Sequence, residues 1–243
     1  MNIIDACKVG NAKELEVIIA EGNVDLNQKD FGDHTPLYYA MENDSPELVK
    51  LLLAEPSTVL GMADSDGHTA LMAACENNNE ECIRLYLEDK RCSIHIVNMK
   101  TNHNDGKYQG TTALCNALIK GHVKIAKLLL SIPKIDLNIV GWIRNDRDKY
   151  FYVNPLVTAI KAGLEDVVKL LLENPNTKLE NAPLYRVCYK DEYQDDTITP
   201  ESVRCIEMLL NNERYKNEEK LINEDKRQPS TNEAMLSGRQ IIF

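Results

Sequence analysis

The sequence predicts an all-α solenoid in which one pair of short helices is repeated along the chain. Apolar residues recur fourteen positions apart inside each of five segments, and the first three segments follow one another every 34 residues. The pairs are Ile3 and Val17, Leu37 and Leu51, Leu71 and Leu85, Leu114 and Leu128, and Leu156 and Leu170. A fixed period of this length indicates stacked helical units, and such an array grows by adding units rather than by enlarging one core.

Each unit carries a start signal and a stop signal for its first helix. Thr35 is a suitable N-cap, and Pro36 suits the first helical position because its missing N–H would have no partner there. In each unit, the residue nine positions after the one equivalent to Thr35 is of a type that tolerates a left-handed backbone conformation. These residues are Gly10, Asp44, Asn78, Gly121, Gly163 and Asp191. The second helix has a wide apolar stripe, as in residues 48–52, which predicts burial on one side.

Three stretches carry the same motif. They are Asp-Ser-Asp-Gly-His-Thr-Ala-Leu-Met-Ala-Ala at 64–74, Thr-Ala-Leu with Gly-His-Val at 112–114 and 121–123, and Asn-Pro-Leu with Gly-Leu-Glu-Asp-Val-Val at 154–156 and 163–168. The motif resembles the ankyrin repeat family over about residues 1–212. The resemblance implies an ankyrin-repeat solenoid with projecting finger loops that binds other proteins. The His usual after the motif's Leu is replaced by Tyr38, Met72, Cys115, Val157 and Tyr185.

The predicted organisation is six units followed by a tail. The units lie near residues 1–32, 33–66, 67–109, 110–152, 153–180 and 181–212, and the tail is the charged segment 213–243. Two interpretations of the tail stay open, a helix packed over the last repeat and a linker.

The composition disfavours several classes of function. The net charge is −10 and no dense stripe of Lys and Arg is present, so nucleic acid is not an expected partner. No segment has the length of a membrane span, and no secretory signal is visible at the start. The seven cysteines are scattered and odd in number, which predicts free thiols in a reducing cytoplasm without a metal site. We expect a monomer that binds no cofactor.

The period breaks twice, and the breaks predict two extended fingers. Leu71 and Leu114 are 43 residues apart and Leu114 and Leu156 are 42 apart, although the fourteen-residue spacing inside each unit is kept. The surplus is therefore expected between units, in the fingers at 99–109 and 140–152. Insertions in repeat arrays often mark the binding face.

The second extended finger is the main candidate for a binding site. It holds the only tryptophan of the chain and several other aromatic and basic residues, which are common interface anchors. The expected contacts are Trp142, Arg144, Arg147, Tyr150, Phe151 and Tyr152, with Lys107 and Tyr108 of the other finger. An alternative stays open, in which Trp142 and Phe151 pack the loop onto the next unit.

The exposed side of the first helices is a second candidate. Family resemblance places Glu42 and Glu76 there in the first half of the array, and Lys120, Lys161, Tyr189 and Lys190 in the second half. This distribution predicts an acidic half and a basic half, which would orient a partner. A merely solvated face is the alternative.

Two classes of function follow. The first is a non-enzymatic scaffold or adaptor for a protein partner, with an effector acting in the cytoplasm of a host cell as a variant, because ankyrin arrays also occur among such effectors. The second is an enzyme or an enzyme-regulating subunit that uses a Cys–His site, for which Cys115, His34 and His68 are the candidates. No nucleophile elbow or phosphate-binding glycine loop supports the second class, so no catalytic residue is predicted.

Overall fold

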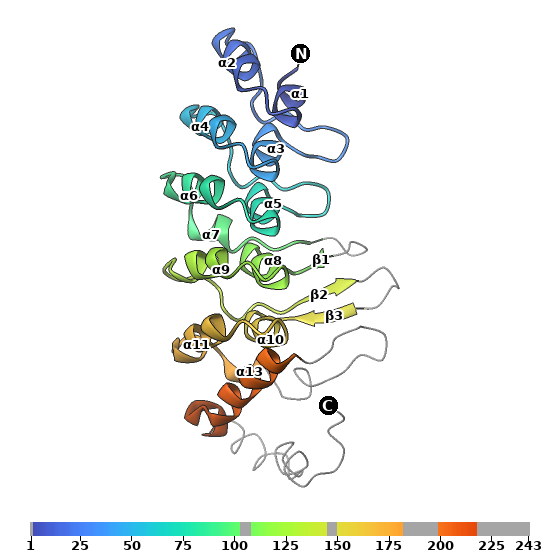
Figure 1. The fold of residues 1–243 in the computed structure, drawn as a ribbon. Helices are drawn as coiled ribbons and strands as arrows, with labels where there is room; N and C mark the ends of the chain where they lie inside the picture. Colours follow the sequence, from blue (N-terminus) through green and yellow to red (C-terminus); the bar gives the residue numbers. More distant parts are fainter. Residues whose placement is uncertain (1, 103–107, 145–149, 182–198, 218–243) are drawn as a thin grey trace. The chain divides into compact units, whose positions relative to one another are not determined.

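The computed structural model describes residues 2–102, 108–144, 150–181 and 199–217. The chain divides into two compact units, residues 1–136 with 141–151 and residues 137–140 with 152–243. Each unit is described separately, with the labels of Figure 1. Every helix in the described ranges is too short or too polar to cross a bilayer.

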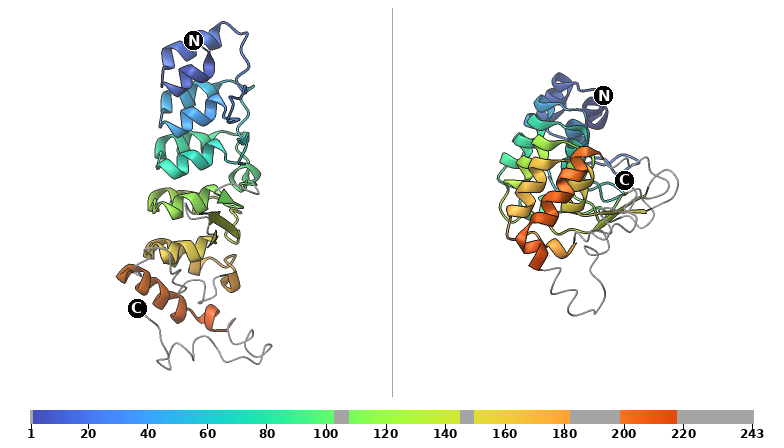
Figure 2. Two further views of the ribbon diagram at one scale, coloured as in Figure 1. Left: turned by 90° about the vertical axis from the view of Figure 1, so that its right-hand side faces the viewer. Right: turned by 60° about the horizontal axis from the view of Figure 1, so that its bottom comes forward.

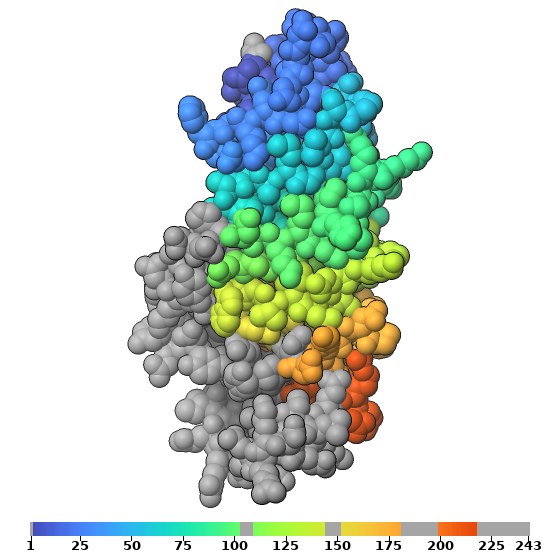
Figure 3. All heavy atoms as spheres, turned by 180° about the vertical axis from the view of Figure 1, so that it is seen from behind, coloured from blue at the N-terminus to red at the C-terminus, as the bar shows by residue number. Residues whose placement is uncertain are grey.

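The first unit contains two rows of helices. The inner row is α1 (Ile3–Lys8), α3 (Pro36–Glu42), α5 (Ala70–Asn77) and α8 (Ala113–Ile119), and the outer row is α2 (Ala12–Ala20), α4 (Pro46–Ala54), α6 (Glu80–Glu88) and α9 (Val123–Leu130). Successive inner helices pack against one another, and each inner helix packs on the outer helix that follows it. Figures 1 and 2 show the two rows, and in Figure 3 the surfaces of successive helix pairs meet along this unit. These contacts make the predicted stack.

The second unit continues the same pattern with fewer described elements. They are α10 (Pro155–Lys161), α11 (Glu165–Glu173), the 3-10 turn η1 (Leu179–Asn181) and α13 (Pro200–Asn211). Helix α13 packs on both α10 and α11. Residues 213–217 are also helical, and Tyr215 is buried.

The predicted start signals are confirmed wherever the structure describes them. The hydroxyl of Thr35 accepts a hydrogen bond from the backbone N–H of Tyr38 at 3.2 Å, with Pro36 at the first helical position. Thr69, Thr112, Asn154 and Thr199 cap α5, α8, α10 and α13 through their side chains in the same way. Capping satisfies backbone donors that the helix itself leaves without a partner.

The predicted stop signals are also confirmed. The residues at this position have φ angles of 72° at Gly10, 51° at Asp44, 65° at Asn78, 73° at Gly121 and 66° at Gly163. A left-handed residue reverses the chain directly after the inner helix, so the outer helix can pack back on it. Asp191, the sixth predicted stop, lies outside the described residues.

The fourteen-residue pairs need one correction. Their first members are core residues, each about 1% exposed. Their second members lie at the margin of the outer helices, and Val17 and Leu170 are 54% and 42% exposed. The outer helices bury their neighbours instead, including Leu15, Leu52, Ile83, Leu129 and Leu171. An outer helix is covered on only one side, so the edges of its apolar stripe reach solvent.

The loops that lead into the inner helices form the fingers. The first and second fingers (residues 29–34 and 63–68) are short turns, and the third and fourth (residues 99–111 and 140–153) are the extended ones. Three short strands, β1 (Tyr108–Gln109), β2 (Gly141–Arg144) and β3 (Tyr150–Val153), form a sheet in the order β1-β2-β3. Figure 1 shows the first and second fingers on the side of the inner helices away from the outer row.

The surplus of the third repeat is divided between two places, which corrects the prediction that all of it lies in the finger. Buried Leu60 and Val97 mark equivalent points of two repeats. Nine residues lead from Leu60 to the cap Thr69, but fifteen lead from Val97 to the cap Thr112. Six extra residues therefore lie in the third finger. The other three precede Val97 and form the short helix α7 (Ile94–Val97).

The surplus of the fourth repeat lies wholly in its finger, as predicted. Buried Leu137 occupies the position equivalent to Leu60 and is followed by the cap Asn154 after seventeen residues instead of nine. The eight extra residues belong to the segment that contains β2 and β3. Length has therefore been added at the finger and not between the two helices of the pair.

Asparagines on the inner margin join consecutive repeats. The amide of Asn27 donates to the carbonyl of Ser57 and accepts from the N–H of Val59, at 2.8 Å each. Asn98 bonds in the same way to Lys134 and Asp136, and Asn138 to Asn176 and Lys178. The equivalent position between the second and third repeats is Gly61, which has no side chain to make these bonds.

Two arginines close the ends of outer helices. Arg91 donates to the carbonyls of Leu53, Glu55, Pro56 and Thr58 at 2.7 to 3.3 Å. In the second unit Arg214 makes the same set of bonds to Leu172, Asn174, Pro175 and Thr177 at 2.9 to 3.4 Å. The last carbonyls of a helix have no partner within the helix, and a guanidinium has enough donors to serve several of them.

Candidate partner-binding surface

The base of the extended fingers is a rigid backbone structure. Thr101 and Thr111 are buried and bond to each other through the backbone at 3.0 Å and through their hydroxyls at 3.2 Å. Strand β1 then pairs with β2, so that Tyr108 lies opposite Ile143 and Gln109 opposite Trp142. The strands approach so closely that a Cβ atom on Gly141 would lie 2.7 Å from the carbonyl oxygen of Gln109. A side chain at Gly141 would therefore force the strands apart.

Trp142 stands on this sheet with part of its ring in solvent. Its exposed fraction is 36%, and the preceding Val140 is 43% exposed. Tyr152, on β3, is half-buried. A tryptophan that is neither in the core nor fully solvated combines a backbone held by strand pairing with a partly exposed apolar side chain, which is the form that interface anchors take.

The other predicted finger residues are placed less fully. The backbones of Arg144, Tyr150, Phe151 and Tyr108 belong to strands β2, β3 and β1. Their side chains lie outside the described parts of the structure, as do Lys107 and Arg147 entirely. The alternative in which Phe151 packs onto the next repeat therefore stays untested.

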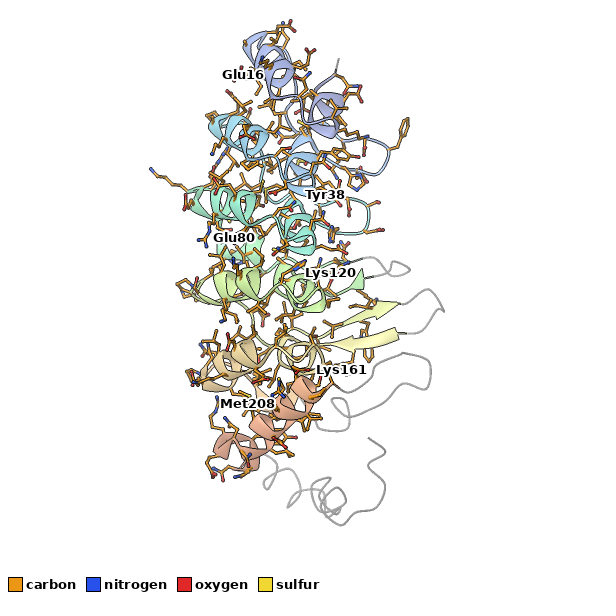
Figure 4. The ribbon with its side chains drawn as sticks, in the orientation of Figure 1. Glu16, Tyr38, Glu80, Lys120, Lys161 and Met208 are labelled. Atoms are coloured by element: carbon orange, nitrogen blue, oxygen red, sulfur yellow. The ribbon has the colours of Figure 1, made fainter. Side chains whose placement is uncertain are left out.

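The inner helices of the first unit bring Glu76 and Lys120 together. The Lys120 ammonium lies 2.9 Å from one Glu76 oxygen, and His68 Nε2 lies 3.7 Å from the other. His122 also contacts the backbone carbonyl of Glu76 at 3.0 Å. Figure 4 shows Lys120 and Tyr38 on the inner row, whereas Glu16 and Glu80 lie on the outer row. Because an acid of the predicted acidic half pairs with a base of the predicted basic half, the charge contrast between them is reduced at this point.

Glu42 differs from Glu76 in having no ion pair with a described residue. It is half-buried at the end of α3. Burial raises the pKa of Glu42, and repulsion from Glu76 adds to the increase while His34 opposes it. A cation brought by a partner would relieve this unfavourable environment. Lys161, the base of the second unit, is exposed at the end of α10. Tyr189 and Lys190 lie outside the described residues.

The sequence did not reveal a polar network under the first two fingers. Asp30 Oδ2 accepts hydrogen bonds from Lys8 at 2.9 Å and from the hydroxyl of Tyr39 at 2.6 Å. Burial alone would raise the pKa of Asp30, but the bonds from Tyr39 and Lys8 and from backbone N–H groups outweigh it and hold the pKa well below its usual value. His34 lies 3.4 Å from Asp30 and 3.4 Å from Asp64, so it links the two fingers.

The network continues to buried His68. Its Nε2 contacts the amide nitrogen of Asn116 at 3.0 Å, and its ring lies 6.2 Å from that of Tyr38. Burial lowers the pKa of His68, although Asp64 and Glu76 oppose the effect. Burial therefore favours the neutral form of this ring, which is part of the packing.

The cysteines argue against the Cys–His alternative. Six of them are described, and all six are free thiols. Cys115, the proposed nucleophile, is fully buried, and burial raises its pKa. Burial also raises the pKa of Cys7 and Cys82 to about 12 and of Cys92 to about 11. Since the thiolate is the reactive form, none of these thiols suits nucleophilic chemistry. Among the described residues no group of three potential ligands gathers to hold a metal ion.

Phe31 is an exposed residue that the sequence reasoning missed. It lies at the tip of the first finger, and its side chain is entirely in solvent, with an exposed fraction of 113%. The signal was present in the sequence, because the equivalent residue of the second finger is the polar Ser65.

Comparisons with known proteins agree with this architecture. Residues 59–141 match a family model described as ankyrin repeats in three copies, and residues 32–59 match a model described as the ankyrin repeat. A search of curated proteins gave no match. The helix pairs α1–α2 and α10–α11 lie outside the matched residues but keep the same stop signals. Repeats of this kind generally mediate protein–protein interaction. Residues 32–141 are therefore ankyrin repeats.

Proposed function

We propose that the chain is a non-enzymatic adaptor that holds a protein partner against its extended fingers and its inner helices. The observation that carries the proposal is Trp142, a partly exposed aromatic ring fixed on strand β2 by pairing with β1. A preorganised aromatic group contributes much of the affinity of an interface because little conformational entropy is lost when it binds. Arg144, Arg147, Tyr150, Phe151, Tyr152, Lys107 and Tyr108 complete the proposed contact.

The inner helices would orient the partner. Glu42 offers a carboxylate without an ion pair to a described residue, and Lys161 offers an exposed ammonium group in the second unit. Charges of this kind mostly affect the association rate and the register of a complex. Tyr189 and Lys190 are kept in the proposed surface on the sequence argument alone.

The six described cysteines are free thiols, five of them buried, which supports a reducing compartment, and we place the protein in a cytoplasm. The proposal of a monomer is kept from the sequence analysis. The alternative of an enzyme or enzyme-regulating subunit has one specific test. A thiol probe at neutral pH is expected to react slowly with the folded protein and quickly after denaturation. A single fast thiol in the folded state would revive a Cys-based site.

The binding proposal is tested by affinity capture from lysate followed by binding measurements on the purified partner. Trp142→Ala is compared with wild type and with Val59→Ala, whose side chain is 50% exposed in the loop after α4. Loss of a central anchor costs about 2 kcal/mol, or about 30-fold in Kd, whereas a peripheral residue costs little. Equal binding by all three proteins would refute the role of the fourth finger, provided that they melt alike.

A further inference from the structure

The sheet of the extended fingers ends in β3. The order of the strands is β1-β2-β3, so β3 has β2 on one side and is the last strand of the sheet among the described residues. The backbone of a last strand directs every second N–H and C=O group away from the sheet, where these groups can pair with another strand. We call this side of residues 150–153 the outer edge of β3.

Backbone hydrogen bonds join successive fingers in a ladder. The N–H of Asn102, in the third finger, donates to the carbonyl of Asp66, in the second finger, at 3.4 Å. Asn102 also pairs with Gln109 within the third finger, and Gln109 lies opposite Trp142 of the fourth finger. The second and third fingers are thus each joined to the finger of the next repeat. The fourth finger would need a fifth finger to continue the ladder.

The sequence supplies no fifth finger of sufficient length. Buried Leu179 and Leu60 are equivalent, because the residue before each of them donates its N–H to an asparagine of the preceding repeat. Nine residues lead from Leu60 to the cap Thr69. Only three lead from Leu179 to the Ala-Pro-Leu at 182–184, which matches the Thr-Pro-Leu at 35–37. Three residues are too few for a strand and a return to the next helix, so the next repeat has no finger to pair with β3.

The composition of β3 does not protect its outer edge. Residues 150–153 read Tyr-Phe-Tyr-Val, and all four are aromatic or β-branched types that favour strands. Natural proteins commonly place lysine, other charged residues or proline in an edge strand to prevent pairing with another chain, and β3 contains none of these. The sequence of β3 is therefore suited to pairing on both sides.

The outer edge is also fixed in position. Val153, at the end of β3, is 3% exposed. The next residue, Asn154, accepts a hydrogen bond from the N–H of Leu156 at 3.0 Å and donates one to the carbonyl of Ile139 at 3.2 Å. Since Ile139 lies two residues before β2, one side chain joins the bases of β2 and β3. A strand held in this way loses little conformational entropy when a partner pairs with it.

We infer that the protein partner binds through an extended segment that adds a fourth strand to the outer edge of β3. The inference rests on the proposed function, since it specifies how a protein partner meets the fourth finger. Backbone hydrogen bonds to β3 provide affinity and register, and alternate side chains of the segment extend the apolar surface to which Trp142 contributes. The occupant is a peptide segment because an extended backbone presents donors and acceptors at the spacing of a strand.

The chain without a partner provides the first test. Amide hydrogen exchange followed by NMR should show slow exchange for the N–H groups of residues 150–153 that face β2, and fast exchange for the alternate N–H groups. Slow exchange of all these groups would mean that the chain covers the edge itself, which would overturn the inference. A dimer in light scattering that a proline in β3 abolishes would also overturn it, because the occupant would be a second copy.

The second test uses linear peptides selected from a display library against the full chain. A selected peptide should slow the exchange of the outward N–H groups of β3. N-methylation along the peptide should raise its Kd about 10-fold at every second residue and little at the residues between, because alternate peptide N–H groups face β3. Protection elsewhere in the chain, tolerance of N-methylation at every position, or a library without binders would overturn the inference.

A matched pair of variants separates the outer edge from the side chains. Proline replaces whichever of Phe151 and Tyr152 has the fast-exchanging N–H, so that a donor not used by β2 is lost. Alanine at the same position removes the side chain but keeps the N–H. The Kd of the peptide should be about 10-fold higher for the proline variant than for the alanine variant, with similar melting temperatures. Equal Kd values would refute the addition of a strand.

The failure of this inference can be distinguished from the failure of the proposed function. A protein partner whose Kd rises with Trp142→Ala but is equal for the proline and alanine variants would support the fourth finger and refute the added strand. A partner whose Kd is unchanged in all three variants would contradict both.

Discussion

Asp30 closes the first finger with its carboxylate, whereas Thr101 and Thr111 close the third finger with one backbone bond and two bonds of the Thr101 hydroxyl. In the short finger one carboxylate binds the N–H groups of a turn and is itself held by Lys8 and Tyr39. In the long finger the chain pairs with itself and then with β2. A side-chain closure fixes the length of the turn, but strand pairing can be extended residue by residue. The third finger thus combines a neutral closure with strand pairing, and the first depends on one charged group.

The second and third fingers come into contact at Gly67, and a substitution there is expected to have the largest effect on the free energy of unfolding. Gly67 has a φ of 77°, and a Cβ atom there would lie 2.6 Å from the backbone nitrogen of Asn102. Gly67→Ala should lower the free energy of unfolding by about 3 kcal/mol, since a left-handed alanine and a steric clash add together. Gly22→Ala is the control, because Gly22 has a φ of 73° and nothing within 4 Å of its Cβ position. It should cost about 1 kcal/mol. Equal losses in urea denaturation would show that the contact between the fingers does not matter.

Removing the charge of Asp30 should destabilise the protein more than removing the hydroxyl of Thr101. Asp30→Asn weakens hydrogen bonds to a charged, mostly buried group and should cost about 2 kcal/mol. Thr101→Val keeps the shape and the N–H of residue 101 that donates to Thr111, but it removes the hydroxyl that accepts from the Thr111 N–H, and it should cost about 1 kcal/mol. Thermal unfolding at neutral pH compares them directly. The reverse order would mean that the short fingers do not depend on their carboxylates.

The stability at acidic pH should distinguish the Asp30 turn from the Thr101–Thr111 contact further. The pKa of folded Asp30 lies below the ordinary value of 3.8, so its stabilisation is fully present above about pH 4 and is lost as the pH falls below that value. The melting temperature of wild type should therefore drop more steeply below pH 4 than that of Asp30→Asn. Thr101→Val should follow wild type. Parallel curves for all three proteins would contradict the carboxylate mechanism.

His68 should give the smallest effect. Its pKa is lowered below 6.5 in the folded state, chiefly by burial, so protons bind the unfolded chain more readily. Stability should decline slightly as the pH falls below about 6.5, and His68→Gln should remove that slope. NMR titration of the His68 ring measures the shift directly. An unshifted ring would show that the packing around Tyr38 and Asn116 is open to water.

Local features of the fold were predictable because neighbouring residues determine them. Thr35, Thr69 and Thr112 each cap a helix by accepting a hydrogen bond from the backbone N–H three residues further along. Gly10 and Asn78 end helices because each adopts a left-handed backbone conformation. The stacked-repeat fold followed from the spacing of apolar residues. The exposed second members of the apolar pairs did not follow, because spacing identifies a stripe but not its margins.

The features that sequence reasoning missed depend on residues far apart in the chain. Asp30 needs Lys8, 22 residues away, and Arg214 needs carbonyls up to 42 residues away. Helix α7 was also missed; three of its four residues are the β-branched Ile94, Ile96 and Val97, which have a low helix propensity. Trp142 was chosen as a candidate anchor from its type and its place in the sequence, and its partial exposure could be seen only in the structure. Phe31 was overlooked although comparison with Ser65 would have revealed it.

Gly61 has a consequence for how such an array can change in length. Asn27 and Asn138 tie the loops after α4 and α11 to the preceding repeat, and Arg91 and Arg214 tie the same loops to the following one. A loop that is bonded to both the preceding and the following repeat cannot accept an insertion unless the bonds to one of these repeats are broken. Because Gly61 has no side chain, the loop after α6 lacks the asparagine bonds to the preceding repeat. This loop is also the one that contains α7 with its three extra residues.

The same glycine also makes room for the insertion. A Cβ atom at Gly61 would lie 3.2 Å from Cγ1 of Ile96 in α7. The absence of a side chain at Gly61 thus leaves the loop without that bond and leaves space for Ile96 of α7. Protein engineers who wish to graft new segments into this scaffold should find two tolerant sites, the finger tips and the loop opposite Gly61, and should avoid the doubly tied loops.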